Sequence, residues 1–490
     1  MHPETTPLLS ALLQRAALDR APFYTPGHKQ GQGLAPSLLA ALGSAPGRLD
    51  LPELPGLDNL AAPDGVIREA QDLAAATFGA DHTWFLVNGS TAGVIAMILA
   101  TCSPGDRILL PRNVHQSAIA GLILSGAVPV FVQPDYDPQQ DLLCSLSPAR
   151  VATALEQSPQ IRAVLLVSPT YHGICGNVAA IAQIAHAHEI PLLVDEAHGP
   201  HFAFHPELPT PALAAGADLV VQSTHKVLSA LTQAAMLHLR GQRIDPDRIS
   251  RTLRLVQTTS PSYLLLASLD TARQQMALQG QEWMAHTLAL ADRARQQIST
   301  IPGLTVLGSD QVGSHPGFHA LDRTRLTVTV AGLGLTGFAA DEILDRDLGV
   351  TAEFPSYRHL TFIISLGNTE PDIDRLVQGL RTLAEQFPIQ PPTSNLQNWD
   401  QSTLSFDLST PVLSPRHAYF APTEIVPVAQ AIDRISAELI CPYPPGIPLL
   451  LPGEPIRLEV IAALRAIQAA GGQITGCADS TLATLVVVKQ

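Results

Sequence analysis

Six short apolar runs between residues 83 and 221 alternate with longer stretches of helical pattern, and this alternation constrains the fold more than any other feature. The runs are residues 83–87, 107–110, 128–132, 163–167, 190–194 and 219–221. Near-continuous apolar strands separated by helices predict a mostly parallel sheet with helices on both faces. In such sheets the ligand binds beyond the carboxyl ends of the strands. The residues directly after each run are therefore the candidates for a functional site.

Residues that can perform chemistry follow five of these runs, at 88–91, 115, 170–172, 195–198 and 223–226. Lys226 follows one buried run and Asp195 ends another. A lysine amine condenses with an aldehyde, and an acid can pair with the protonated ring nitrogen of pyridoxal phosphate. Lys226 alone would be interpreted as a solvated surface group. Lys226 together with Asp195 predicts a Schiff-base cofactor, pyridoxal 5'-phosphate.

The small residues 88–91 open an apolar helix directly after the first run. The hydroxyls of Ser90 and Thr91 and the backbone amides there could face an anion, helped by the helix N-terminus. An ordinary N-cap also explains serine and threonine at this place. Asp195 and Lys226 on neighbouring strand ends favour the phosphate site. His115 follows the second run and could lay its imidazole on a pyridine ring, although a lone histidine is more often a satisfied polar residue.

Two other motifs suggest different chemistry. His198, His201 and His205 lie close to Asp195, but Pro200 prevents one regular helix from presenting them together, so a metal site is not favoured. His198 is expected to orient groups near the cofactor. Residues 332–337 match a dinucleotide-binding fingerprint, with Glu353 about 20 residues later. Too few strands follow to complete a dinucleotide-binding sheet, so a tight strand-to-helix turn is expected there.

Composition excludes several classes of protein. Residues of hydrophobic type make up 46% and charged residues 15%, and no apolar run reaches the roughly 20 residues that span a bilayer. The net charge of −14 argues against nucleic acid as a partner. The N-terminus lacks the pattern of a signal peptide, and five scattered cysteines fit reduced thiols, so a cytoplasmic protein is expected.

The length predicts two or three domains. Residues 1–300 are expected to hold an N-terminal segment and the large cofactor-binding domain, and residues 301–387 a small α/β domain. Residues 388–402, rich in proline and polar residues, are interpreted as a linker. Residues 403–490 remain for a C-terminal domain.

At these residues the sequence resembles the ornithine/lysine/arginine decarboxylases of fold type I, in the short form without an N-terminal wing domain. The resemblance runs nearly end to end. It is carried by residues 25–29, 54–60, 88–91, 195–199, 223–226, 259–263, 436–438 and 442–448. The motifs at 25–29 and 442–448 are the most specific, whereas the aspartate and lysine are shared with many aminotransferases. The resemblance implies a transferase-like large domain, a small α/β domain and a C-terminal α+β domain.

The resemblance also implies roles for individual residues. Lys226 would bind the cofactor aldehyde covalently, Asp195 would pair with the pyridinium nitrogen, and His115 would stack on the ring. The phosphate would be surrounded by Ser90, Thr91, Ser223 and His225. Thr259 and Ser260 would reach the phosphate of a neighbouring subunit, which implies a homodimer with shared sites. Glu353 would face the distal group of the substrate.

The predicted activity is the decarboxylation of a basic L-amino acid, with catalytic roles for Lys226, Asp195, His198 and His115. Arginine to agmatine is favoured, followed by lysine to cadaverine and ornithine to putrescine. Two alternatives stay open, an aminotransferase and a non-catalytic homologue that binds a partner. An aminotransferase would hold the substrate carboxylate with an arginine clamp, for which Arg358 is the nearest candidate.

Overall fold

The computed structural model describes residues 2–389, 411–443 and 446–489. Its largest unit is a seven-stranded sheet in the order β1-β10-β9-β8-β6-β2-β3, which confirms the predicted mostly parallel sheet. The strands are β1 (His82–Leu86), β2 (Arg107–Pro111), β3 (Val128–Val132), β6 (Ile161–Val167), β8 (Leu192–Asp195), β9 (Leu219–Gln222) and β10 (Ala235–Leu239). Five neighbouring strands are parallel, whereas β10 is antiparallel to both β9 and β1. Two reversals give β1 the direction of β9, so the end of β1 lies at the same edge of the sheet.

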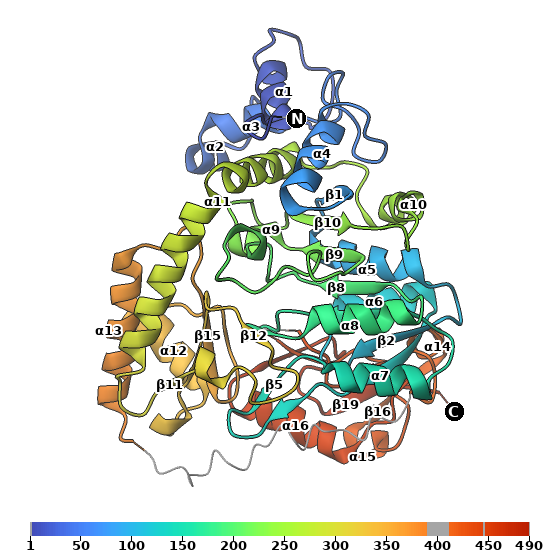
Figure 1. The fold of residues 1–490 in the computed structure, drawn as a ribbon, viewed down its shortest axis with the longest axis vertical. Coiled ribbons are helices and arrows are strands. Elements are labelled where there is room, and N and C mark those ends of the chain that lie inside the picture. The colour runs from blue at the N-terminus through green and yellow to red at the C-terminus, as the bar shows by residue number, and fades with distance from the viewer. Residues whose placement is uncertain (1, 390–410, 444–445, 490) are drawn as a thin grey trace.

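Helices cover both faces of this sheet because successive strand residues point to opposite sides. Leu193 packs into one core with α5 (Gly89–Thr101), α6 (Gln116–Ser125) and α10 (Pro246–Val256). Its neighbours Leu192 and Val194 pack into a second core with α7 (Pro148–Gln157) and α8 (Val178–Ala187). Figure 1 shows the sheet between these layers.

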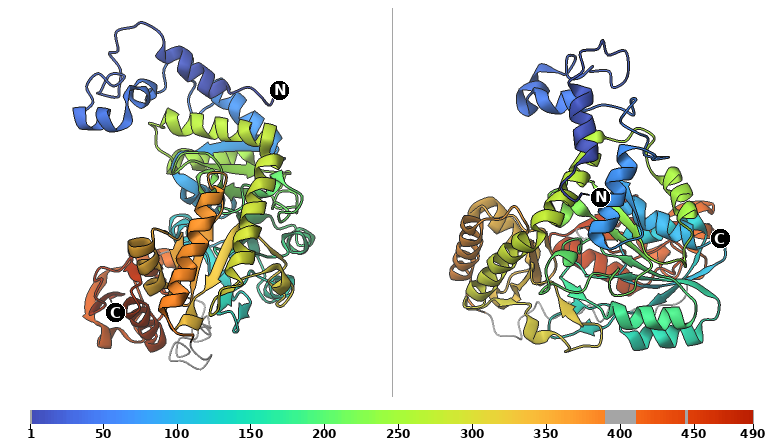
Figure 2. Two further views of the ribbon diagram at one scale, coloured as in Figure 1. Left: turned by 90° about the vertical axis from the view of Figure 1, so that its left-hand side faces the viewer. Right: turned by 45° about the horizontal axis from the view of Figure 1, so that its top comes forward.

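The N-terminal helices stand at one end of the molecule. They are α1 (Pro7–Ala16), α2 (Pro36–Leu42), α3 (Ser44–Leu49) and α4 (Val66–Phe78). Helices α1 to α3 lie beyond the long helix α11 (Tyr263–Ile298), whereas α4 lies beside it (Figures 1 and 2). The buried pair Asp270–Arg273 on α11 holds this segment, because Asp270 accepts from the Leu8 amide at 3.0 Å and Arg273 donates to the Pro3 carbonyl at 2.6 Å.

The second half of α11 enters the small domain, whose sheet has the order β11-β13-β15-β14. These strands are β11 (Thr305–Val306), β13 (Arg325–Thr329), β14 (Phe354–Pro355) and β15 (His359–Ile363), and all their pairings are antiparallel. Helices α12 (Gly337–Leu348) and α13 (Glu370–Gln386) pack on it. The predicted linker, residues 388–402, lies almost entirely outside the described residues, and the predicted domain boundaries stay predictions.

The C-terminal residues form a separate core, against which Phe338 of the small domain packs, and Leu451 packs into a core of the large domain. Its elements are α14 (Pro415–Phe420), β16 (Thr423–Pro427), α15 (Val428–Ala431), β17 (Cys441–Tyr443), α16 (Leu458–Ala469), β18 (Gln473–Thr475) and β19 (Thr484–Val488). Further short elements include β4 (Tyr136–Asp137), β5 (Leu142–Leu143), β7 (Ile174–Cys175), α9 (Thr224–Val227) and β12 (Ala320–Leu321). Among the helices that the structure describes, we find none with the length and apolar character to cross a membrane.

Candidate active site

A cavity of about 450 Å³ lies at the carboxyl edge of the large sheet. Nine of the predicted site residues line it, namely Ser90, Thr91, His115, Asp195, His198, Ser223, His225, Lys226 and Glu353. Asp195 is the last residue of β8, and Lys226 lies on the short helix α9 that follows β9. Because β8 and β9 are parallel neighbours, the two side chains reach the same space. The structure therefore brings together the acid and the amine on which the sequence prediction rests.

One end of the cavity is formed by the N-terminus of α5. Gly89 has φ +74, a conformation that favours glycine, and it turns the chain from β1 into the helix. Ser90 follows and accepts a hydrogen bond from the Ser223 hydroxyl at 2.7 Å. The Ser90 hydroxyl at the start of this 13-residue helix and the Ser223 hydroxyl bonded to it form a polar cradle suited to an anion.

Lys226 meets a histidine at the other side of the cavity. Its Nζ lies 2.9 Å from Nε2 of His198. The opposite ring nitrogen, Nδ1 of His198, accepts from Nη2 of Arg325 at 2.7 Å. The Tyr171 ring packs edge-on against the imidazole, with centroids 5.1 Å apart. His198 is thus fixed between two basic side chains from different domains.

His115 presents its ring from the N-cap of α6. Its Nδ1 accepts from the amide of Ser117 at 3.2 Å, which fixes the ring. Gly446 packs against the same ring, since a Cβ added there would lie 3.5 Å from it. Gly446 also accepts the Gln116 amide through its carbonyl at 3.2 Å. A loop of the C-terminal domain therefore closes this side, and Tyr443 from the same region lines the cavity.

Burial sets the protonation of these groups. It lowers the pKa of the Lys226 amine, and the charge of Arg325 lowers it further, while Asp195 opposes the shift. Burial and the charge of Lys226 lower the pKa of His115 to about 4, and burial lowers the pKa of His198 well below its usual value. Burial raises the pKa of Asp195, which Lys226 counteracts. At neutral pH the imidazoles of His115 and His198 are therefore uncharged, beside an amine whose pKa is lowered.

Several candidate residues lie elsewhere. Thr259 lines a different cavity, of about 380 Å³, and Ser260 is exposed with its amide bonded to Thr258. Their predicted role at a neighbouring subunit stays a prediction. Arg358, the candidate for an arginine clamp, is not among the residues that line the cavity of Lys226.

The three neighbouring histidines His198, His201 and His205 make separate contacts. His201 pairs with Asp322 at 3.2 Å, whereas His205 accepts the amide of Glu207. Only His198 faces Lys226. The placement of these three side chains therefore does not support a metal site that they would share.

The glycines of residues 332–337 serve backbone packing. A Cβ at Gly337 would lie 2.2 Å from the carbonyl oxygens of Ser356 and His359, and one at Gly332 would lie 2.4 Å from that of Gly303. The adjoining sheet is antiparallel, unlike the sheet of a dinucleotide-binding unit. The expected tight turn is confirmed.

Sequence reasoning missed four contributors to the site: Tyr171, Phe354, Tyr443 and Arg325. Tyr171 lies within the candidate residues 170–172, in the loop that follows β6, and this place after a strand was the available signal. The other three approach from the small and C-terminal domains. They do not follow a strand of the large sheet, so the expectation that site residues lie after those strands cannot find them.

Comparison with known proteins identifies the family. The sequence profile described as "Orn/Lys/Arg decarboxylase, major domain" matches residues 6–370, and the one described as "Orn/Lys/Arg decarboxylase, C-terminal domain" matches residues 400–481. The chain belongs to the Orn/Lys/Arg decarboxylase family. This confirms the resemblance noted in the sequence.

Relatives and solved structures agree with this membership. Four relatives that are 36–38% identical are named arginine decarboxylase. That of Bacillus subtilis strain 168 is 38% identical over 100% of this chain and 99% of its own. The structure of the Escherichia coli constitutive lysine decarboxylase has a TM-score of 0.82 at 22% identity, covering 99% of this chain and 82% of that chain. The ureidoglycine–glyoxylate aminotransferase of B. subtilis has a TM-score of 0.53 at 13% identity, covering 69% of this decarboxylase-family chain and 89% of that chain. The transferase-like fold of the large domain is thereby confirmed.

Proposed function

We propose that this protein is a pyridoxal 5'-phosphate-dependent decarboxylase that converts L-arginine to agmatine and carbon dioxide. The observation that carries the proposal is the cavity shared by the Lys226 amine, the Asp195 carboxylate and the Ser90–Ser223 hydroxyl pair. A covalent anchor, an acid for a ring nitrogen and an anion cradle are the three features that this cofactor requires.

The residues of the cavity fit the cofactor. Lys226 would hold the aldehyde carbon, and Asp195 would accept a hydrogen bond from the protonated ring nitrogen. The positive charge of that nitrogen would offset the buried carboxylate of Asp195, whose pKa burial raises. Uncharged His115 would offer its ring face. Ser90, Thr91, Ser223 and His225 would surround the phosphate.

When bound, the cofactor accepts the electron pair of the Cα–carboxylate bond as carbon dioxide leaves. Asp195 would keep the ring nitrogen protonated, and a protonated ring is the more effective electron acceptor. A proton must then reach Cα. Nε2 of His198 lies 2.9 Å from Nζ of Lys226, and these two groups are the candidate donors. Solvent returns the proton afterwards, so the balance is one amino acid and one proton consumed for one amine cation and one carbon dioxide.

The position of Glu353 supports the proposal that the substrate is a basic amino acid. Its amide is fixed to the Thr361 carbonyl at 3.0 Å, and its side chain lines the cavity that contains Lys226. A carboxylate there can bind a guanidinium through two hydrogen bonds or an ammonium through one. The names of the full-length relatives favour arginine among these substrates.

A product assay tests the activity. The purified protein, loaded with pyridoxal phosphate, is incubated with arginine, lysine or ornithine, and carbon dioxide and amine are both measured. We expect equal amounts of agmatine and carbon dioxide from arginine and no product from the Lys226→Ala variant. An enzyme that forms no amine from any of the three, but turns over when a keto acid is added, would be an aminotransferase and the proposal would be wrong.

We further propose a homodimer in which Thr259 and Ser260 complete the site of the partner. These residues lie outside the Lys226 cavity of their own chain, which is compatible with a role across an interface. Subunit mixing tests this. Lys226→Ala and a Thr259→Ala/Ser260→Ala variant should each be weak alone, whereas an equal mixture should recover about a quarter of wild-type activity, since half of the dimers hold one intact site. Failure to recover activity in dimers shown to exchange subunits contradicts shared sites.

A further inference from the structure

Arg325, the first residue of β13, is the buried partner of His198. Its side chain is 1% exposed. Its Nη2 donates to Nδ1 of His198 at 2.7 Å and to the backbone carbonyl of the same residue at 3.3 Å. In the part of the chain that the structure describes, the hydrogen bonds of Arg325 to the site therefore run through His198, from the small domain.

The contact with Arg325 determines where the proton of His198 resides. A guanidinium stays charged and has donors only, so Nδ1 of His198 must accept. A neutral imidazole that accepts at Nδ1 carries its proton on Nε2. That Nε2–H points at Nζ of Lys226, 2.9 Å away. An ammonium has no lone pair and cannot accept this hydrogen bond.

We infer that Arg325 is a positioning residue that fixes the proton of His198 on Nε2 and thereby holds Lys226 as a neutral amine. A neutral amine is the form that attacks an aldehyde. The inference rests on the proposed function only for the covalent role of Lys226. The arrangement of donors and acceptors itself is independent of any cofactor.

Other charged groups around Lys226 and His198 affect the protonation of the two side chains, some favouring it and some opposing it. Asp195 and Glu353 favour a protonated Lys226, whereas Arg325 disfavours it. The imidazole of His198 is faced by Lys226, Arg325, His115 and His225, and all four oppose its protonation. The neutral state of His198 is thus enforced from α9, β13 and the start of α6 together.

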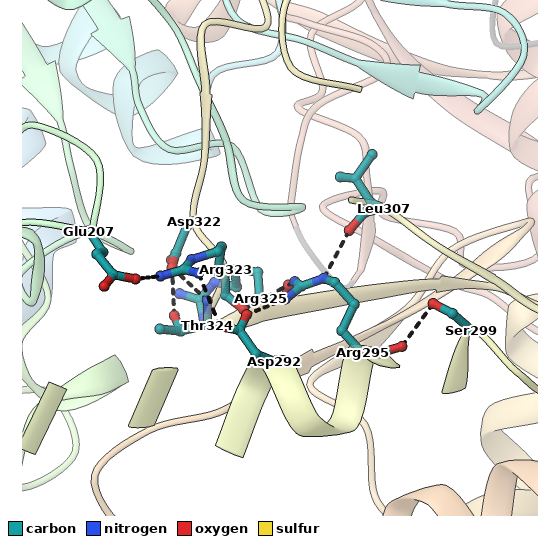
Figure 3. A network of polar contacts seen from close by, with 9 residues as sticks. All are labelled: Glu207, Asp292, Arg295, Ser299, Leu307, Asp322, Arg323, Thr324 and Arg325. Atoms are coloured by element: carbon teal, nitrogen blue, oxygen red, sulfur yellow. Dashed lines mark hydrogen bonds and ion pairs between the residues drawn. The ribbon is translucent and has the colours of Figure 1, made fainter. Parts of the chain in front are cut away.

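Burial lowers the pKa of Arg325, and the charge of Asp322 opposes this shift. The Asp322 carboxylate accepts from the Thr324 hydroxyl at 2.7 Å and pairs with His201. Figure 3 shows Arg325 beside Asp322 and Thr324. Arg323 lies two residues earlier but pairs instead with Asp292 and Glu207. Within the described residues it makes no hydrogen bond or ion pair with His198, and it is a matched control for removing a nearby cation.

Nitrogen NMR of the wild-type chain, labelled with ¹⁵N-histidine, reads the position of the proton directly. The signal of His198 is assigned from its loss in His198→Phe, and spectra are recorded with and without pyridoxal phosphate from pH 6 to 8.5. We expect a neutral imidazole protonated at Nε2 throughout. A proton on Nδ1, or a cationic ring, overturns the inference. This measurement needs no arginine variant to fold.

The rate of covalent attachment of pyridoxal phosphate, followed by visible absorbance across pH, tests the consequence for Lys226. We expect the Arg325→Met variant to attach the cofactor about tenfold more slowly at neutral pH. The pH profile of its attachment rate should move about one pH unit upward. Arg325→Lys keeps a charged donor and should remain within about threefold of wild type. Arg323→Met should be unchanged. An Arg325→Met profile identical to wild type overturns the inference.

A double-mutant cycle separates a role through His198 from the direct field of the guanidinium. If Arg325 acts through His198, then in a variant that already carries His198→Phe, adding Arg325→Met should no longer shift the pH profile of cofactor attachment. A shift that persists in full there refutes the positioning role. If wild-type protein never attaches pyridoxal phosphate but His198 carries its proton on Nε2, the proposed function fails and the inference about Arg325 stands.

Discussion

Arg112 joins the C-terminal domain to the large domain, and its removal should loosen both the fold and the site. Its guanidinium donates to the carbonyls of Pro448 at 2.7 Å and Leu449 at 3.2 Å, and to Oε2 of Glu454 at 3.1 Å. Replacement by methionine would leave the buried carboxylate of Glu454 with the Leu451 amide, at 3.0 Å, as its remaining hydrogen bond in the described structure. Breaking one partner of a buried pair costs about 3–5 kcal/mol. We expect Arg112→Met to lose that much free energy of unfolding.

Urea unfolding followed by circular dichroism measures this loss, with calorimetry to separate transitions of the different cores. Arg112→Met/Glu454→Gln should recover roughly 1–3 kcal/mol, since a buried amide costs less than a buried unpaired charge. Arg457→Met is the control, because the Arg457–Asp433 pair is exposed on both sides and contributes about 0–1 kcal/mol. The substrate KM should also rise, since the same loop carries Gly446 to His115. A loss no larger than that of Arg457→Met would refute the reasoning.

Three further predictions concern other parts of the molecule. Burial raises the pKa of Glu196 to about 8, from an ordinary value near 4.5, so its contribution to stability is complete below pH 4.5 and is lost as the pH rises through 8. Glu196→Gln should remove this part of the pH dependence in urea titrations from pH 5 to 9, and an unchanged slope would contradict it. Glu353→Gln should raise the KM for arginine about tenfold or more while kcat changes less, as steady-state kinetics can show; an equal fall in kcat with constant KM would argue against distal binding. Gly337→Ala should cost about 1–3 kcal/mol because its Cβ meets two carbonyl oxygens, whereas Gly367→Ala, with open space around it, should be neutral; equal melting temperatures would contradict the clash.

The large sheet could be predicted from sequence because burial on both faces leaves a continuous apolar pattern. The same pattern gives no strand order, and β10 was missed. Its residues Ala235–Leu239 are fully buried and include His238, which is satisfied by Thr83 on β1 at 2.8 Å and by Gln222 on β9 at 3.2 Å. These partners are distant in sequence, so a polar residue that looks out of place in a strand becomes intelligible only after the sheet is assembled. The antiparallel direction of the small sheet was hidden for the same reason.

The site shows the same division between local and assembled information. Asp195, His198, Ser223 and Lys226 could be found because a strand end fixes where the next side chains point. Arg325 begins its strand and belongs to another domain, so no rule about strand ends leads to it. Yet its donors decide which nitrogen of His198 carries the proton, and hence which form of Lys226 the cavity accepts. The chain therefore encodes the reactive groups locally, while their protonation depends on how the small domain packs against the large one.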